Sequence, residues 1–210
     1  MTETSVRTVA PLPVVRPGQV AWTGDNPFIY LKADPAGDWS SLSVFFRIAA
    51  SPYGTGRAAV VVENPYAADD RKAARVVLTD NVELAQYLVR DFLAKFILFR
   101  PSEVMEDLEY VADAEFNQVL EGNDWTEEAT AGDRSISLTW RGLGDPFAVD
   151  VPAPESGTGL HEMFAVFRIA QGGEVSVDGR RLAGTTIERD FLNGRGQSAG
   201  MAISETWVEQ

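Results

Sequence analysis

Two stretches of this chain resemble one another, and this internal repeat constrains the fold more than any other feature. Each copy contains a tryptophan, then a Pro-Phe pair, then a strand-like Phe-Arg-Ile-Ala segment. The matched pairs are Trp22 and Trp140, Phe28 and Phe147, and Phe46 and Phe167, at offsets of 118, 119 and 121 residues. A period this long is unlike that of a solenoid. We therefore expect one domain built from two similar β-rich halves, related by a pseudo-twofold axis that brings residues 20–63 onto residues 135–207 once the insertion 172–198 is removed.

Apolar residues alternate with other residues in both copies, which is typical of β-strands. The dipeptides Asp178-Gly179 and Asn193-Gly194 are typical of hairpin turns. We predict a mainly β fold, an antiparallel barrel or sandwich built from two duplicated halves. The strands expected are 28–32, 44–49, 60–63 and 75–78 in the first half, and 136–140, 147–151, 163–170 and 200–208 in the second.

One amphipathic helix is expected over residues 80–98, packed on an end or a face of the β structure. Leu84, Leu88, Phe92 and Phe96 recur there at helical spacing, and Pro101 follows. Residues 102–121 fit both a helix and a strand, and we expect a helical start and a strand finish.

These patterns divide the chain into an arm and a single domain. The Pro-rich residues 1–19 are expected to be extended, and residues 20–210 to form the domain. Within it we expect repeat half 1 (20–78), the helix (80–98), an acidic connector (99–133) and repeat half 2 (134–210).

Charge is distributed unevenly along the chain. The net charge is −13, and eleven acidic residues without a basic one lie between Glu103 and Asp133. Such a field repels phosphate backbones, so we expect no nucleic-acid partner. The acidic segment is a solvated edge, a cation site or a docking face for a basic partner, and the lack of a calcium-binding loop spacing favours the solvated edge.

The chain contains no cysteine, which excludes disulfides, thiolate catalysis and Cys-ligated zinc and suits a reducing compartment. The first thirteen residues lack the basic and apolar regions of a signal peptide. Charged residues interrupt the longest apolar stretch, 84–99, so that it is unsuited to cross a membrane. We expect a cytoplasmic protein without a membrane partner.

His161 is the sole histidine, and it is followed by Glu162 at the start of an expected strand. A single histidine excludes a metal site with several histidine ligands, but one imidazole can still act as a general acid or base. The other copy of the repeat has Ser40 in this place, so the shared scaffold does not require a histidine. We predict His161 and Glu162 as catalytic candidates, with no metal and no cofactor. The alternative is a surface histidine without a role.

Several other side chains are candidates for binding a substrate. Arg47 and Arg168 occupy the same place in both copies, where they point either outward to solvent or inward to bind a carboxylate. Tyr30, Trp39 and Trp125 are suited to lining an apolar cavity or its mouth.

Two carboxylates, Glu63 and Glu205, lie at corresponding strand ends of the two copies. They are either solvated, or buried with a raised pKa and able to act as bases.

Two functions fit these observations. The first is a small-molecule-binding β-barrel that acts on an apolar or aromatic molecule, as a cofactor-independent lyase, isomerase or cyclase. The second is a non-catalytic interaction or assembly protein that uses the acidic segment and the Pro-rich arm, and a homodimer is left open. An aromatic cavity with convergent polar groups favours the first function.

Overall fold

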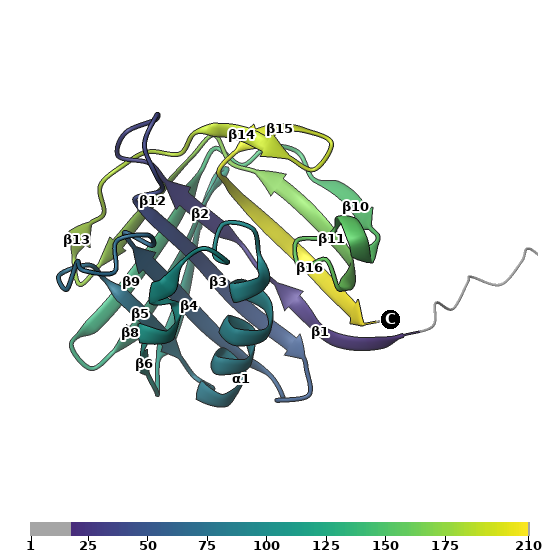
Figure 1. Ribbon diagram of the computed structural model, residues 1–210, viewed down its shortest axis with the longest axis horizontal. Helices are drawn as coiled ribbons and strands as arrows, with labels where there is room; N and C mark the ends of the chain where they lie inside the picture. The colour runs from purple at the N-terminus through teal and green to yellow at the C-terminus, as the bar shows by residue number, and fades with distance from the viewer. Residues whose placement is uncertain (1–17, 210) are drawn as a thin grey trace, which may run out of the picture.

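The protein is a β-sandwich in which two sheets pack face to face and a helix covers the outer face of the larger one (Figure 1). The computed structural model describes residues 18–209, so the expected arm lies outside the described residues apart from its last two positions. The prediction of a mainly β, antiparallel fold is confirmed. Of the two alternatives, the sandwich is observed, because the outermost strands of the larger sheet do not pair to close a barrel.

The larger sheet has nine strands within residues 18–209. Their order is β10 (Phe147–Val151), β11 (His161–Ile169), β16 (Ala199–Glu209), β1 (Gln19–Asp25), β3 (Ser41–Ala50), β4 (Gly56–Glu63), β5 (Arg75–Thr79) and β6 (Glu109–Val111), and β2 (Phe28–Leu31) pairs with both β16 and β3. All neighbours are antiparallel except β5 and β6, which are parallel because the helical connection returns the chain across the sheet.

The smaller sheet and a separate hairpin complete the β structure. The smaller sheet has the order β13 (Arg180–Arg181), β12 (Gly172–Val177), β9 (Arg134–Arg141), β8 (Asp124–Ala131) and β7 (Glu115–Glu121). The hairpin consists of β14 (Glu188–Phe191) and β15 (Gly194–Gln197), which pair only with each other. The two expected hairpin turns lie where β12 turns into β13 and where β14 turns into β15.

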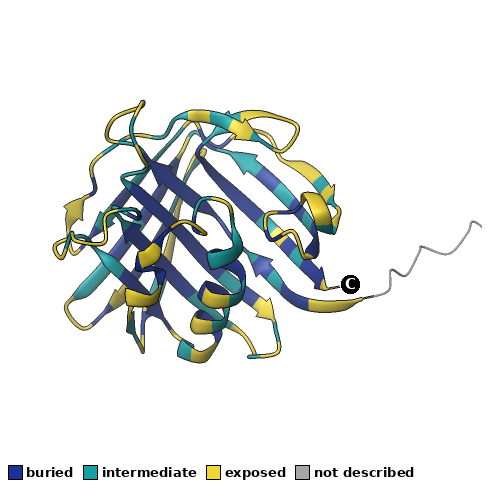
Figure 2. Ribbon diagram, viewed as in Figure 1, coloured by how far each residue is buried: buried dark blue, intermediate teal, exposed yellow. Residues whose placement is uncertain are grey.

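The central strands of the larger sheet are buried on both faces, which explains their long apolar runs (Figure 2). Successive side chains of a strand point to opposite faces. Phe45 accordingly joins a cluster between the two sheets with Leu138 and Trp140 of the smaller sheet. Phe46 joins a second cluster on the other face, beneath the helix.

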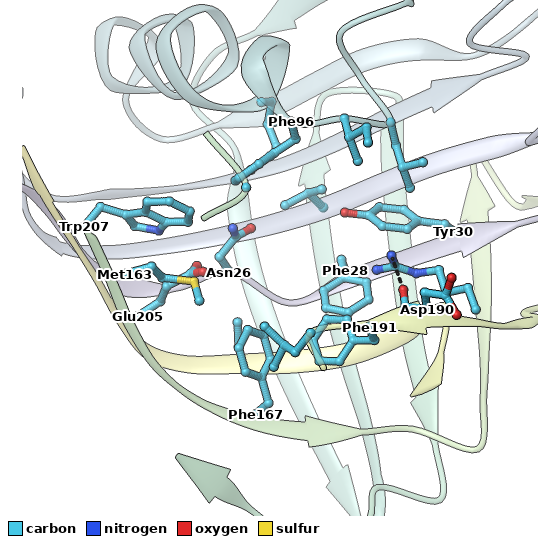
Figure 3. A pocket seen from close by; sticks show the side chains of 18 residues that line it. Asn26, Phe28, Tyr30, Phe96, Met163, Phe167, Asp190, Phe191, Glu205 and Trp207 are labelled. Carbon is cyan, nitrogen blue, oxygen red and sulfur yellow. Dashed lines mark hydrogen bonds between the residues drawn. The ribbon is translucent and has the colours of Figure 1, made fainter. Parts of the chain in front are cut away.

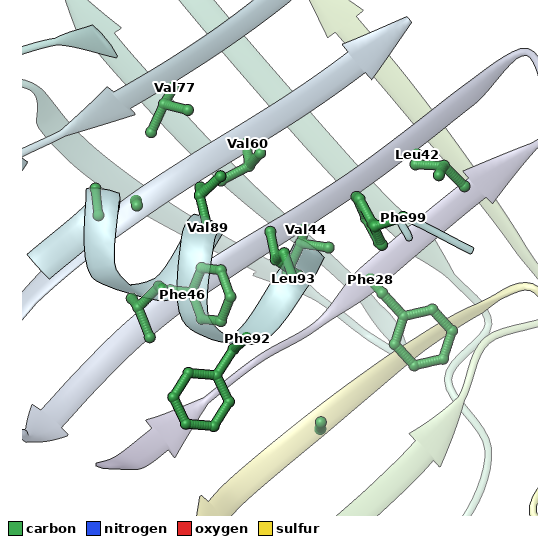
Figure 4. Packing of buried hydrophobic residues seen from close by; sticks show 14 of the residues in the cluster. Phe28, Leu42, Val44, Phe46, Val60, Val77, Val89, Phe92, Leu93 and Phe99 are labelled. Atoms are coloured by element: carbon green, nitrogen blue, oxygen red, sulfur yellow. The ribbon is translucent and has the colours of Figure 1, made fainter. Parts of the chain in front are cut away.

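The expected helix is confirmed on this outer face. It consists of an α-helix, α1 (Val82–Tyr87), a π-helical turn (Leu88–Phe92) and a 3-10 turn (Leu93–Lys95). It begins at Asn81, whose side chain accepts a hydrogen bond from the Leu84 backbone N–H at 3.1 Å. Its apolar side, including Val89, Phe92 and Leu93, packs on the sheet (Figure 4).

The acidic segment supplies strands to both sheets. A 3-10 turn (Glu103–Asp107) is followed by β6 and β7, so the expected helical start and strand finish of residues 102–121 is confirmed. Both acidic residues of β7, Glu115 and Glu121, are exposed, whereas Glu127 of β8 is buried.

The two copies of the repeat correspond in part. β3 lies between β2 and β4, and β11 lies between β10 and β16, so Phe46 and Phe167 occupy similar antiparallel surroundings and share one cluster. Trp22 lies in the larger sheet and Trp140 in the smaller one, in different clusters. The difference arises because residues 142–146 carry the chain from one sheet to the other, whereas β1 leads into β2 within one sheet.

Within residues 18–209, no helix has the length and apolar character needed to cross a membrane.

Candidate functional site

A cavity of about 200 Å³ lies on the outer face of the larger sheet, beside the end of the helix and beneath the β14–β15 hairpin. Six aromatic side chains line it: Phe28, Tyr30, Phe96, Phe167, Phe191 and Trp207 (Figure 3). Ile97 and Leu192, whose side chains are among the exposed large apolar ones, mark its opening. Because a cavity of roughly 150 Å³ accommodates benzene, this space fits a molecule with one ring and a few substituents.

Glu205 of β16 is the acidic group at one end of the cavity. The residue is 3% exposed, and burial raises the pKa of its carboxyl to about 8. The nearby Asn26 amide and Trp207 ring favour the charged form and offset this increase only in part, while the charge of Asp25 adds to it. Glu205 is therefore mainly protonated at neutral pH, so it can donate a proton, and the carboxylate left behind can accept one.

Three buried polar atoms at this end of the cavity have no hydrogen-bond partner among the described residues. They are Asn26 Oδ1, Glu205 Oε2 and Trp207 Nε1. Asn26, Glu205 and Trp207 lie together on one side of the cavity (Figure 3). Unsatisfied buried polar groups cost free energy. A ligand with hydrogen-bonding groups on one edge would remove that cost.

Arg189 of β14 is at the opposite side. Its guanidinium carbon lies 5.7 Å from the ring centroid of Phe28 and 5.5 Å from those of Tyr30 and Phe191. Figure 3 shows these three rings across the cavity from Glu205. Burial raises the pKa of Tyr30 to about 12, despite the opposing charge of Arg189, so its hydroxyl stays protonated.

His161 lies behind the cavity wall. Its imidazole packs against Phe92 and Trp207, at centroid distances of 4.7 and 6.2 Å, and does not line the cavity. The Thr158 hydroxyl oxygen accepts hydrogen bonds from the backbone N–H groups of residues 160 and 161, and it lies 3.0 Å from His161 Nδ1 and 3.4 Å from Ser156 Oγ. Burial lowers the pKa of His161, and the charge of Lys95 lowers it further. Both effects favour the neutral imidazole.

The other predicted catalytic residue, Glu162, is buried beside His161 at the start of β11 and is not among the residues that line the cavity. Its register partner in the sheet is Val208 of β16.

Arg47 and Trp125 meet at another place in the molecule, on the carboxylate of Glu127. Arg47 donates to Glu127 at 2.7 Å and to Asp25 at 3.0 Å, and the Trp125 indole N–H donates to Glu127 at 2.7 Å. Arg47 thus neither points freely into solvent nor lines the cavity, but connects the two sheets.

Arg168 and Trp39 also contact other parts of the protein and do not line the cavity. Arg168 donates to the backbone carbonyl groups of Gly144 and Leu143, at 2.9 and 3.4 Å. Trp39 packs edge-on against Tyr30, with ring centroids 6.0 Å apart. Of the residues selected from the sequence for binding, Tyr30 lines the cavity and Trp39 supports it.

The structure separates the two carboxylates that the repeat placed at corresponding strand ends. Glu63 forms a two-bond ion pair with Arg180, at 2.6 and 2.8 Å, which lowers its pKa. Glu205 has no such ion-pair partner within residues 18–209.

Sequence reasoning missed Asn26 and the hairpin residues Arg189 and Phe191. Asn26 lies in the repeat where the second copy has Asp145, and this difference was the available signal. The hairpin has no counterpart in the first copy, so no comparison within the chain could select it.

The chain matches no protein-family model, no curated protein and no solved structure. What the protein does is therefore inferred from the chemistry of its cavity.

Proposed function

We propose that this protein binds a small, mainly apolar molecule with a single ring in the cavity beside Glu205, and acts on it as a cofactor-independent lyase or isomerase. The observation that carries the proposal is a cavity walled by aromatic rings around a buried carboxyl with an unpartnered oxygen. Apolar walls with a few convergent polar groups are the usual composition of small-molecule sites.

Glu205 is the acid–base group in this proposal. Its pKa of about 8 lies near neutral pH, where a general acid or base works most efficiently. Transfer of its proton to the bound molecule, and return of a proton from the same molecule, regenerates the carboxyl. An isomerisation or elimination by this route needs no cofactor. Because His161 does not line the cavity, we assign proton transfer to Glu205 and a supporting position behind Trp207 to His161.

The acidic surface gives weaker support to an interaction protein. β7 is an edge strand of the smaller sheet, and Leu120 on it is 57% exposed. Charged residues on an exposed edge are also the common protection against unwanted strand pairing. The cavity is the more specific feature of the two.

A fragment screen with single-ring compounds, read by tryptophan fluorescence and calorimetry, tests the binding part of the proposal. Ala202 is buried and lines the cavity, so Ala202→Leu should fill it and weaken binding strongly. Ala148→Leu is the matched control, since Ala148 is exposed on β10 and does not line the cavity. Binding that survives Ala202→Leu unchanged would place the ligand elsewhere and contradict the proposal.

A further inference from the structure

Arg189 is a cationic side chain at the cavity without a carboxylate partner. No acidic group within residues 18–209 lies within ion-pair distance of it, and its Nε is buried without a hydrogen-bond partner. Its one hydrogen bond within residues 18–209 is a long one of 3.3 Å, from Nη1 to the backbone carbonyl of the neighbouring Asp190. Its N–H donors form no other hydrogen bond in the part of the chain that the structure describes.

The acidic residues of the same hairpin are already engaged. Arg195 of β15 forms ion pairs with Glu188 and Asp190 of β14, at 3.2 and 3.3 Å. These two carboxylates flank Arg189 in the sequence, and both pair with Arg195, so that neither forms an ion pair with Arg189.

The aromatic walls hold the guanidinium in place. Phe28, Tyr30 and Phe191 lie within 5.7 Å of its central carbon, as stacking and cation–π contacts require. A guanidinium held by its faces presents N–H donors along its edges in the planar fork that fits a carboxylate.

The opposite end of the cavity does not repel an anion. The Glu205 carboxyl is held in its neutral form by burial, and the Asn26 amide beside it is uncharged. Asp190, the other acidic residue that lines the cavity, has an exposed side chain that pairs with Arg195. An ammonium group would be repelled by Arg189 and would meet the neutral carboxyl of Glu205 at the far end.

We propose that the ligand of this cavity is a small aromatic carboxylate, whose carboxylate binds Arg189, whose ring lies between the aromatic walls, and whose far edge faces Glu205 and Asn26. This proposal rests on the proposed function, since it names the class of molecule that the same cavity binds. It adds a specificity-determining residue that does not take part in proton transfer.

Three probes of similar shape test the proposal on the full-length protein by calorimetry at pH 6.5: benzoate, benzamide and benzylamine. Benzoate should bind at least about tenfold more tightly than benzamide, because hydrogen bonds to charged partners are the stronger ones. Arg189→Gln should remove this difference while leaving benzamide binding unchanged. Arg181→Gln, which removes the same charge from an exposed position on β13, is the control and should change neither affinity.

Arg189→Lys is a second variant that distinguishes a loss of binding from a folding defect. It keeps the positive charge but not the planar fork of the guanidinium, so it should bind benzoate with intermediate affinity. Equal affinity for benzoate and benzamide, or tightest binding of benzylamine, would overturn the carboxylate proposal and leave the ring-binding function standing. If none of the three probes binds and the fragment screen also finds no ligand, the proposed function fails, and this proposal fails with it.

Discussion

The guanidinium of Arg47 on β3 and the carboxylate of Glu127 on β8 form an ion pair of 2.7 Å that joins the larger sheet to the smaller one. The Glu127 side chain is 1% exposed, and its Oε1 also accepts hydrogen bonds from Gln118 and Trp125. A buried carboxylate depends on such partners, because its desolvation is otherwise uncompensated.

Arg47→Met should therefore destabilise the protein markedly. We expect a loss of about 2–4 kcal/mol, towards the lower part of the range for buried pairs, because the Arg47 side chain is itself 33% exposed. Urea unfolding measures the change. Arg57→Met, which breaks a more exposed pair with Asp80, should cost less than about 1 kcal/mol. In the double variant Arg47→Met, Glu127→Leu, much of the lost stability should return. A double variant no more stable than Arg47→Met alone would argue against an uncompensated carboxylate as the cause.

Glu205 should make the stability of the protein fall as the pH rises. Its folded-state pKa of about 8 lies above the ordinary value of 4.5, so the folded protein holds a proton that the unfolded chain loses between these values. Each unit of pKa difference corresponds to about 1.4 kcal/mol, so the decrease amounts to a few kcal/mol. Glu205→Gln should abolish it. The measurement is the urea midpoint at pH 5, 7 and 9, with the exposed Glu115→Gln as control. A wild-type protein and a Glu205→Gln variant with parallel pH profiles would show that the carboxyl is ionised in the folded state.

His161 should make the stability of the protein fall as the pH decreases below 6.5. Its pKa is lowered by burial below the ordinary 6.5, so the unfolded chain takes up a proton that the folded protein does not. Stability contributed by the neutral imidazole is therefore present above pH 6.5 and is lost as the pH falls below it. His161→Gln should flatten this acid limb, measured as thermal midpoints between pH 5 and 7.5. A steeper limb in the variant would contradict a neutral imidazole.

Once a substrate is found, the kcat values of two variants will show whether Glu205 or His161 transfers the proton. If Glu205 transfers the proton, Glu205→Gln should reduce kcat by about 10²–10⁴-fold, and His161→Ala should leave most of it. The reverse result would return the catalytic role to His161, as its place in the sequence suggested.

Two phenylalanines at matching repeat positions should differ in their contribution to stability. Phe46 is fully buried and packs edge-on against Trp22, so Phe46→Ala should cost about 3–5 kcal/mol. Phe167 lines the cavity, so part of its ring faces open space, and Phe167→Ala should cost less. Chemical unfolding of both variants tests this, and equal losses would indicate that the cavity is closed around Phe167 in solution.

The sequence was informative about architecture because apolar periodicity is a local property. The strands around Phe46 and Phe167, the helix over residues 80–98 and the hairpin turns all follow from spacing along the chain. The sheet assignment of Trp22 and Trp140 did not follow, since it depends on whether a five-residue link stays within one sheet or crosses to the other.

The candidate site was harder to predict from the sequence, because it depends on contacts between residues that lie far apart along the chain. Arg47 and Arg168 have equivalent places in their strands, yet one binds a carboxylate across the sheets and the other binds backbone carbonyl groups. Glu63 pairs with Arg180, which lies more than 100 residues further along the chain. Among the described residues, Glu205 has no arginine in such a position, and spacing along the chain does not indicate this difference.

The β14–β15 hairpin provides Arg189 and Phe191 to the cavity while its strands pair only with each other. Substitutions along it alter the charge and shape of the cavity without disturbing a hydrogen bond of either main sheet. The hairpin is thus a replaceable module: exchanging about ten residues would change the cavity, and with it the ligand preference that we propose, while the sandwich and Glu205 on β16 are left unchanged.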